Sequence, residues 1–344
     1  MKVLFNCNNT VFQVPGGGEI LLLKTKEYLE KAGIKVKLFD QWHDKMIDYD
    51  IMHNFGKTDN SYDFIKLSKM YNLPVVLTPI YNWPALSYGL NEHFLTPQKI
   101  KNIGYTLLKK HFPMVSKSKK IMMMTDLITP DSMIEGRLLC KDFGFPIRKI
   151  HPVPCGVDER FYKAKPDEFI DKYKLQDFVL FVGKIEPRKN ILSLIRIMNK
   201  IKVPLVIIGS KTQDNLTYYE NCVKIAKKNI YFLGNMDHGS SMLESAYAAA
   251  KVLVMPSWYE TPSLVGLEAG LAGANIVITR RGSTMDYYNK YALYVNPRSN
   301  LDIEMKIRKA LDKDKNKDLS LHIKKNFLWS RVIERLIIGY KKVI

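Results

Sequence analysis

Cysteine is scarce in this chain of 344 residues, which contains only four, at positions 7, 140, 155 and 222. No two of them have the spacing of a metal site, and four scattered cysteines do not form the framework of a disulfide-stapled fold. A chain without such a framework is typical of a reducing compartment. The expected location is therefore the cytoplasm.

Long hydrophobic runs are also missing. No apolar stretch approaches the roughly 18 residues that a membrane-spanning helix needs, although 46% of the residues are hydrophobic. The first seven residues, MKVLFNC, read as a strand and are too short for a signal peptide. Any membrane contact is expected to be peripheral, at the inner face of the membrane.

Acidic residues are outnumbered, with 34 Asp and Glu against 53 Lys and Arg, which gives a formal net charge of +19. Such an excess indicates an anionic partner: nucleotide phosphates, an anionic membrane surface or nucleic acid. The alternative is lysine used as a default surface residue. Residues 98–124 mix lysines with apolar side chains, so they form either an amphipathic element on an anionic leaflet or an ordinary surface helix. No nucleic-acid motif is present, and no nucleic-acid partner is expected.

Neither a G-x-G-x-x-G fingerprint nor a P-loop occurs in the chain. The sequence instead alternates short apolar runs with helical patterns, and residues 252–284 organise it. The apolar run 252–255 reads as a buried parallel strand. After it, a helix is expected to begin with Thr261 as its cap and Pro262 at its first position.

Two glutamates frame that helix start, Glu260 in the preceding loop and Glu268 within the helix. The free amides around Ser263, Leu264 and Val265 would form an anion site, at the carboxyl ends of the strands where α/β sheets bind ligands. A phosphate there would have a carboxylate on each side. Carboxylates accept hydrogen bonds from sugar hydroxyls, so the pattern indicates a nucleotide sugar. The alternative is that Glu260 only caps a helix and Glu268 is an exposed helical residue.

The segment E-T-P-S-L-V-G-L-E-A-G-L-A-G, from Glu260 through Glu268, resembles the Glu-x7-Glu motif of retaining GT-B glycosyltransferases of family 4, the glycosyl transferases group 1. The chain departs from the family with Thr261-Pro262-Ser263 where Gly-Phe-Gly is usual. The resemblance covers nearly the whole chain. It implies that Glu268 binds the ribose hydroxyls and that Glu260 contacts hydroxyls of the donor sugar near the reacting carbon.

A second segment, residues 183–190, resembles the family pattern G-R-L-x-x-x-K-G. Lys184 stands at the Arg position and Lys189 at the Lys position, which implies that both hold the donor diphosphate. Two cations there would neutralise the departing nucleoside diphosphate without a metal. The resemblance thus implies Glu260 and Lys189 as the catalytic residues.

The first half of the chain carries the remaining candidates. Gly17 and Gly18 resemble the family's Gly-rich loop, which faces the donor phosphates. His53 follows a strand pattern and is expected on the cleft rim, facing the acceptor; the alternative is a hydrogen-bonded structural histidine. Many family members place a histidine in the loop that here carries Tyr81 and Asn82. This chain has none in that loop, so these two residues are the proposed lining of the acceptor pocket.

The resemblance implies an α/β protein of GT-B fold, with two doubly wound Rossmann-like domains facing a central cleft. Residues 1–155 together with 327–344 would form the N-terminal, acceptor-side domain. Residues 156–326 would form the C-terminal domain, which binds the nucleotide-sugar donor.

The expected function is transfer of a hexose, with retention of configuration, from a nucleotide-diphosphate sugar to a glycan, lipid-linked or cell-surface polysaccharide acceptor. The nucleotide sugar is a co-substrate, and neither a metal nor another cofactor is expected. Front-face attack and a covalent intermediate both stay open, because no carboxylate is clearly placed as the nucleophile. Two rival functions remain: a nucleotide-sugar epimerase of the same fold, and a basic protein that binds an anionic surface.

Overall fold

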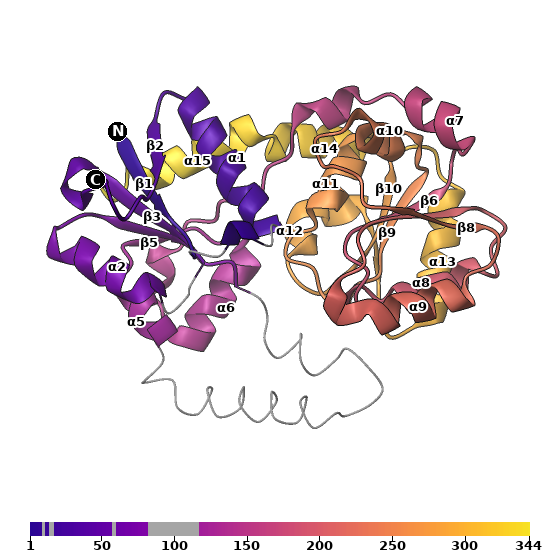
Figure 1. Ribbon diagram of the computed structural model, residues 1–344, viewed down its shortest axis with the longest axis horizontal. Coiled ribbons are helices and arrows are strands. Elements are labelled where there is room, and N and C mark those ends of the chain that lie inside the picture. Colours follow the sequence, from indigo (N-terminus) through magenta and orange to yellow (C-terminus); the bar gives the residue numbers. More distant parts are fainter. Residues whose placement is uncertain (9–10, 14–16, 57–59, 82–116) are drawn as a thin grey trace. The chain divides into compact units, whose positions relative to one another are not determined.

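The computed structural model describes residues 1–8, 11–13, 17–56, 60–81 and 117–344. Within these residues the chain divides into two compact units (Figure 1). The first comprises the described residues up to 81, residues 117–156 and residues 329–344, and the second comprises 157–328. The first boundary, after residue 156, lies one residue C-terminal to the expected one, and the second, after residue 328, lies two residues C-terminal to it. The assignment of the acceptor to the first unit and the donor to the second stays a prediction.

The first unit is built on a five-stranded sheet in the order β2-β1-β3-β4-β5, in which every neighbouring pair is parallel. Its strands are β1 (Lys2–Asn6), β2 (Lys35–Leu38), β3 (Ile51–Phe55), β4 (Val75–Thr78) and β5 (Leu127–Ile128). Its helices are α1 (Gly17–Lys31), α2 (Asn60–Met70), α5 (Lys117–Met124), α6 (Met133–Phe143) and α15 (Trp329–Tyr340), with short 3-10 turns η1 (Val11–Gln13), η2 (Met46–Asp48) and η4 (Ile147–Lys149).

Both faces of this first sheet are covered. Along β1, Val3 and Phe5 pack against α1 and α15, whereas Leu4 faces the opposite way and joins the cluster of α2, α5 and α6. A strand buried on both faces reads as a continuous apolar run rather than an alternating one. That is the pattern of Val3, Leu4 and Phe5 in the sequence.

The second unit contains a six-stranded parallel sheet in the order β11-β10-β9-β6-β7-β8. Its strands are β6 (Val179–Val182), β7 (Leu205–Ile208), β8 (Ile230–Gly234), β9 (Val252–Met255), β10 (Asn275–Thr279) and β11 (Leu293–Val295). Its helices are α7 (Asp167–Tyr173), α8 (Ile191–Met198), α9 (Leu216–Ile225), α10 (Ser241–Ala249), α11 (Leu264–Leu271), α12 (Thr284–Tyr288), α13 (Asn300–Leu311) and α14 (Lys317–Phe327), with 3-10 turns η5 (Glu159–Lys163), η6 (Pro187–Lys189), η7 (Gln213–Asn215) and η8 (Asn289–Tyr291).

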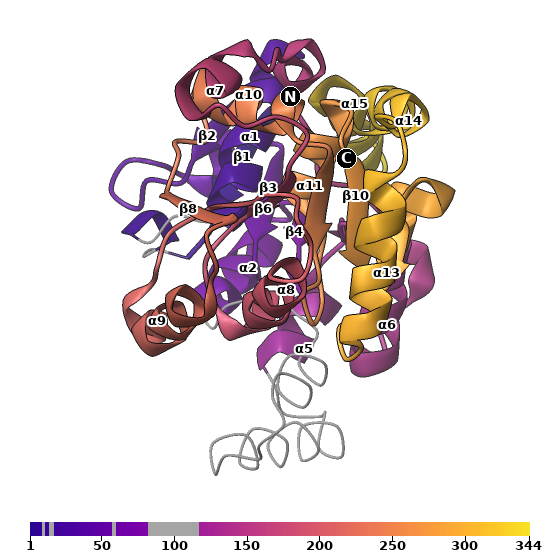
Figure 2. The ribbon, with the colours of Figure 1, turned by 90° about the vertical axis from the view of Figure 1, so that its right-hand side faces the viewer.

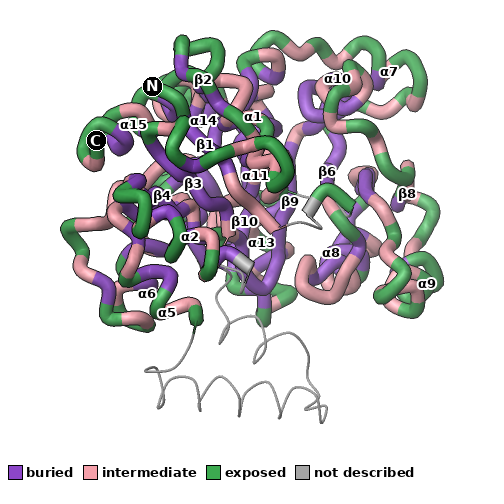
Figure 3. Tube along the Cα trace, turned by 60° about the vertical axis from the view of Figure 1, so that its left-hand side comes forward, coloured by how far each residue is buried: buried purple, intermediate pink, exposed green. Residues whose placement is uncertain are grey.

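The helices of the second unit form two groups around its sheet (Figure 2). Helix α8 packs against α9 and α13, and α11 packs against α10 and α14. The four strands β6, β7, β9 and β10 are buried at every residue, and Figure 3 shows this for β6, β9 and β10 along the Cα trace. In parallel sheets the loops that leave the carboxyl ends of the strands share one edge. The loops after β6, β8, β9 and β10 carry the candidate site residues of this unit.

Residues 326–340 do not form one continuous helix. Helix α14 ends at Phe327 and α15 begins at Trp329, with Leu328 in an extended conformation between them. The division coincides with the boundary between the units, because α15 packs on α1 of the first unit.

Most of the basic segment 98–124 lies outside the described residues, so the expected membrane contact stays a prediction. No helix in the described part of the chain has the length and apolar content needed to cross a bilayer.

Candidate active site

The site of the second unit forms around an ion pair between residues that lie 71 positions apart. Lys189 ends the short turn η6, which follows β6, and Glu260 lies in the loop after β9. The Nζ of Lys189 donates to Oε1 of Glu260 at 2.7 Å. The second cation of that turn, Arg188, has its Nη1 at 4.0 Å from the same oxygen. The two loops of the predicted site thus meet at Glu260.

Burial makes this pair electrostatically strong. The side chains of Lys189 and Glu260 are 12% and 5% exposed, and an ion pair is screened much less in such surroundings than at the surface. Burial opposes ionisation of Glu260, but the charges of Lys189 and Arg188 outweigh it and lower the pKa of this carboxyl. Burial lowers the pKa of Lys189, against the opposing pull of Glu260. The pair can therefore present fixed opposite charges at one edge of the sheet.

The backbone around Glu260 is held by the loop that follows β10. Glu260 and Gly282 form an isolated parallel bridge, in which the amide of Glu260 donates to the carbonyl of Arg281 and the amide of Ser283 donates to the carbonyl of Glu260. This bridge extends the β9–β10 pairing beyond the strands proper. Glu260 is consequently part of a short strand pairing and does not cap a helix.

Helix α11 begins two residues later than expected. Ser263 is its cap, with Oγ accepting from the amide of Gly266 at 3.3 Å, and Leu264 is its first residue. The prediction of Thr261 as the cap and Pro262 as the first helical residue is wrong, because the bridge at Glu260 keeps the chain extended there. The first amides of α11, those of Leu264 and Val265, lie at the positive end of the helix, as expected for an anion site.

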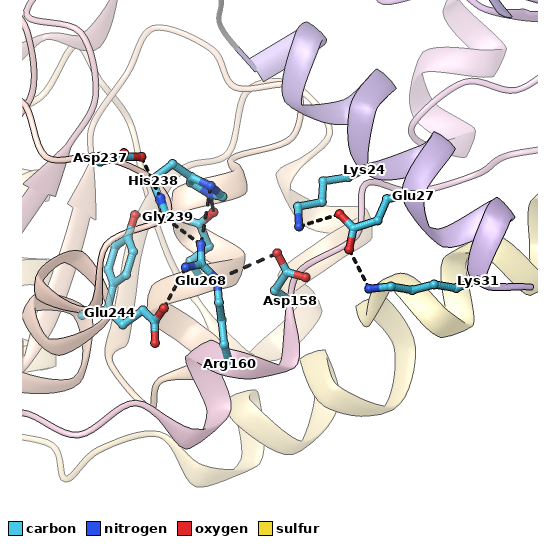
Figure 4. A network of polar contacts seen from close by, with 11 residues as sticks. Lys24, Glu27, Lys31, Asp158, Arg160, Asp237, His238, Gly239, Glu244 and Glu268 are labelled. Atoms are coloured by element: carbon cyan, nitrogen blue, oxygen red, sulfur yellow. Dashed lines mark hydrogen bonds and ion pairs between the residues drawn. The ribbon is translucent and has the colours of Figure 1, made fainter. Parts of the chain in front are cut away.

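Glu268 lies in the second turn of α11 and is 5% exposed, so the alternative of an exposed helical glutamate is wrong. Both of its carboxylate oxygens have partners from the α10 region. Nε2 of His238 lies 2.7 Å from Oε1, and the hydroxyl of Tyr247 donates to Oε2 at 2.7 Å. Figure 4 shows the His238 ring directed at Glu268. The carboxylate is thus oriented by two donors on different oxygens.

A further layer of contacts holds His238. Arg160 donates through Nη2 to the backbone carbonyl of His238 at 2.6 Å and through Nη1 to Glu244 at 2.7 Å. Its guanidinium also lies 4.5 Å from the ring centroid of Phe161. Nε of Arg160 lies 3.9 Å from the carboxylate of Asp158 (Figure 4). The turn that carries His238 is therefore anchored to the η5 segment.

We expect the contact between His238 and Glu268 to make the stability of the second unit depend on pH. The hydrogen bond to Glu268, against the effect of burial, raises the pKa of His238 above its ordinary value. The folded state therefore holds this proton more tightly than the unfolded state does. The resulting stabilisation is complete below about pH 6.5, the unperturbed histidine value, and is lost as the pH rises through the raised pKa.

Denaturant titrations of the wild type and His238→Gln across that pH range measure this effect. The excess unfolding free energy of the wild type over the variant should fall as the pH rises. A difference that stays constant, or grows, would contradict the assignment of the raised pKa to this pair.

The other donor-side candidate, Lys184, is placed differently. It follows Gly183 at the carboxyl end of β6, and its side chain is exposed. Within the described residues, no hydrogen bond or ion pair connects the pair of Lys189 and Glu260 with Glu268. Of the two lysines and two glutamates that are expected to lie around the donor, only Lys189 and Glu260 are in direct contact.

The first unit contains Gly17 and Gly18, which form the first turn of α1. His53 of β3 is 0% exposed, so the prediction that it lies on a rim is wrong. Its Nδ1 lies 2.6 Å from the hydroxyl of Tyr340, and its Nε2 lies 2.8 Å from the hydroxyl of Thr78. Burial lowers the pKa of His53 to about 3. His53 is a neutral structural histidine, which was the alternative interpretation.

Tyr81 is also packed rather than open. It is 6% exposed, its amide donates to Oε1 of Glu135 at 2.7 Å, and its hydroxyl donates to Asp142 at 2.8 Å. Its ring meets that of Phe143 edge to face. A side chain with these contacts does not line an open pocket in the first unit. Asn82 lies outside the described residues.

The partners of Glu268 are the functional residues that the sequence interpretation missed. His238 reads as a helix-terminal residue, and it does precede α10, but its ring also reaches α11. Its position after β8, at the carboxyl edge of the sheet, was the available signal. Tyr247 lies inside an apolar helix pattern, which gives no sign that its hydroxyl bonds a buried carboxylate. Arg160 lies 78 residues from His238, and no local pattern connects them.

The structure also bears on metal binding. The described residues contain no group of three or more His, Cys, Asp or Glu side chains placed to hold a metal ion. The four cysteines all lie among the described residues, and none of them is in a disulfide. Independence from a metal stays a prediction.

Comparison with known proteins relates the second unit to a known family. Residues 164–326 match the model of the family described as glycosyl transferases group 1. The chain is similar to O-antigen chain mannosyltransferase B of Escherichia coli, with 25% identity over 58% of this chain and 56% of that protein. It is also similar to an uncharacterized glycosyltransferase of Methanocaldococcus jannaschii, with 36% identity over 32% of this chain and 29% of that protein. The chain thus matches about half, or less, of the length of these relatives.

Solved structures resemble the chain over nearly its full length. Sucrose-phosphate synthase from Thermosynechococcus elongatus superposes with a TM-score of 0.75 over 99% of both chains, at 17% identity. Anabaena HepE, solved in complex with UDP and glucose, superposes with a TM-score of 0.71 over 99% of this chain and all of that one, at 16% identity. These similarities, with the two parallel α/β sheets, confirm the predicted GT-B fold class. Most of the second unit, residues 164–326, thus matches the glycosyl transferases group 1 family, within a chain of GT-B fold.

Proposed function

We propose that this protein is a retaining glycosyltransferase that moves a hexose from a nucleotide-diphosphate sugar to a glycan or lipid-linked acceptor. The observation that carries the proposal is the buried contact of Lys189 with Glu260, beside the start of α11, in a domain of this family. A cation, a carboxylate and free helix amides at one edge of a parallel sheet are the groups that a sugar diphosphate requires.

Each residue takes one part of the donor in this proposal. The amides of Leu264 and Val265, with Lys184 and Lys189, hold the diphosphate and stabilise the charge that develops on the leaving group. These cations supply the positive charge that a metal supplies in other enzymes, so we propose a reaction without one. Glu268 accepts hydrogen bonds from the ribose hydroxyls.

Glu260 would contact the hydroxyls of the transferred sugar. Its contact with Lys189 supports a donor bound with its sugar at Glu260 and its phosphate at Lys189, on the two sides of the bond that breaks. Lys189 can then respond to charge on the leaving phosphate while Glu260 orients the sugar. Front-face attack and a covalent intermediate are both compatible with this arrangement.

Mannose is the first sugar to test. Two relatives are named mannosyltransferases, the O-antigen chain mannosyltransferase B and the serotype-specific mannosyltransferase WbdA, both of Escherichia coli. Their names support a polysaccharide acceptor as well. HepE, solved with UDP and glucose, supports a nucleoside diphosphate in the same fold but leaves the base and sugar of this chain to experiment.

Thermal unfolding with UDP-, GDP-, ADP- and CMP-sugars tests the donor class. A ligand that is present at about 100 times its dissociation constant adds about 2.7 kcal/mol to the unfolding free energy. We expect one nucleotide-diphosphate sugar to raise the unfolding midpoint and CMP-sugars to have no effect.

Glu268→Ala should weaken binding of that donor by about 1.5–3 kcal/mol, the scale of hydrogen bonds to a charged group.

The rival functions predict other results. An epimerase would convert the nucleotide sugar with no acceptor present, whereas a transferase needs an acceptor for sugar transfer. A basic surface-binding protein would bind anionic vesicles with steep salt dependence, and Glu268→Ala would not affect it. The absence of stabilisation by any nucleotide sugar would overturn the proposal.

A further inference from the structure

We propose that His238 is a positioning residue that makes the site selective for ribonucleotides, because it holds the carboxylate of Glu268 in the orientation that accepts a ribose diol. The inference rests on the proposed function, since it extends the role that the proposal gives to Glu268. It concerns a residue outside the Glu-x7-Glu and lysine segments.

The two partners of Glu268 do not use all of its hydrogen-bonding capacity. An ionised carboxylate offers about four lone-pair positions. His238 takes one on Oε1, and Tyr247 takes one on Oε2, each at 2.7 Å. Each oxygen therefore keeps a position for one more donor. The two neighbouring hydroxyls of a ribose would match two oxygens whose rotation is fixed by these contacts.

The two donors differ in where they lie. Tyr247 is 0% exposed and belongs to the core of the second unit. The side chain of His238 is 35% exposed, against 7% for that of Glu268. His238 thus lies on the solvent side of the carboxylate, where a nucleotide would approach. A change of His238 should alter the orientation of Glu268 without opening the core.

Arg160 fixes how His238 presents its ring. Nη2 of Arg160 donates to the backbone carbonyl of His238 at 2.6 Å and lies 3.5 Å from Nδ1 of the ring. A guanidinium has no acceptor, so Nδ1 of a neutral imidazole facing it is the acceptor and Nε2 carries the hydrogen. Nε2 then donates to Glu268 whether the ring is neutral or charged. His238 is therefore a permanent donor to this carboxylate.

The contacts of Arg160 make this arrangement rigid. Glu244 accepts from its Nη1 at 2.7 Å (Figure 4), and the guanidinium lies 4.5 Å from the ring centroid of Phe161. Phe161 also meets the ring of Tyr247 edge to face, at 5.6 Å between centroids. The segment that carries Arg160 thus supports both donors of Glu268.

The test compares ribonucleotides with their 2′-deoxy counterparts. Dissociation constants for UDP, 2′-deoxy-UDP, GDP and 2′-deoxy-GDP are measured by calorimetry on the full chain as wild type, His238→Ala and His238→Gln. The wild type should prefer the ribo form of the base that binds by about 10-fold or more, the scale of one hydrogen bond to a charged group. His238→Ala should reduce that preference to below about 3-fold, and His238→Gln, which keeps an N–H donor, should largely restore it.

The outcomes separate the two proposals. If His238→Ala weakens both forms by the same factor, or changes neither, the preference is unaltered and the role of His238 is overturned while the proposed function stands. If the wild type binds a nucleoside diphosphate but shows no ribo preference, the role of His238 is overturned and the proposed function stands, whereas binding of no nucleoside diphosphate overturns both proposals. His238→Gln also controls for folding, since its unfolding midpoint can be compared with that of the wild type at the same pH.

Discussion

Lys189→Ala is expected to lower kcat/KM for the donor by roughly 10- to 150-fold and to destabilise the second unit by about 3–5 kcal/mol. The first effect follows from the loss of a charge that meets the donor diphosphate, worth about 1.5–3 kcal/mol. The second follows because Glu260 would be left buried at 5% exposure with its closest cation removed, and breaking a buried ion pair costs about 3–5 kcal/mol. Steady-state kinetics and urea unfolding measure the two effects separately.

The double variant Lys189→Met with Glu260→Gln is the matched control for the first prediction. Replacing both members of a buried ion pair with hydrophobic residues of similar volume is often neutral for stability, and this double variant likewise leaves no unpaired charge buried. We therefore expect its unfolding free energy to return toward that of the wild type while turnover stays low. Recovery of turnover along with stability would mean that the pair serves the fold only, and would contradict its place in the site.

Gly282→Ala should be the other strongly damaging substitution, with a loss of roughly 2–5 kcal/mol in stability and a marked rise in KM for the donor. Gly282 has φ of +99°, and a Cβ there would lie 1.8 Å from the backbone oxygen of Glu260. Backbone atoms cannot move aside as a flexible side chain can. The cost combines overpacking, about 1–3 kcal/mol, with an unfavourable backbone conformation, about 1–2 kcal/mol. The bridge that places Glu260 would be broken.

Gly234→Ala separates these two causes. Gly234 also has a positive φ, +73°, but a Cβ there meets no atom within 4 Å. This control should lose only about 1–2 kcal/mol and keep the KM of the wild type. If both variants lose the same stability and KM stays unchanged in each, the close approach of Gly282 to Glu260 has no role in placing the carboxylate.

The start of α11 shows where sequence patterns fail locally. Thr261 and Pro262 have strong preferences for the cap and the first turn of a helix. The chain is nevertheless extended at Glu260, because its backbone bonds the loop after β10. Ser263 then becomes the first residue free to cap, and its Oγ does so. A pairing between loops some 20 residues apart overrode a local preference.

His53 and Tyr81 show that contacts between residues far apart in the sequence also override what a local pattern predicts. His53 ends up buried because Tyr340, 287 residues away, brings its hydroxyl to Nδ1. Tyr81 is buried because Glu135 and Asp142 of α6 bind its amide and hydroxyl. A histidine at a strand end and a tyrosine in a loop look exposed in a sequence, because nothing nearby shows which helix will cover them. Both assignments to an acceptor face failed for this reason.

The family resemblance supplied the division into two α/β units and the lysine segment after β6, whereas local chemistry alone predicted the alternation of strands and helices, including the strand–loop–helix order around Glu260 and Glu268. Apolar runs and turn residues encode these features within a few positions of one another. The contact of Lys189 with Glu260 and the two donors on Glu268 arise only when the parallel sheet brings its carboxyl-end loops together. These contacts join residues 21 to 71 positions apart, and burial gives them their strength. The strength of these polar contacts depends on which side chains are neighbours in space and on the low dielectric of the buried site. A pattern along the sequence shows neither of them.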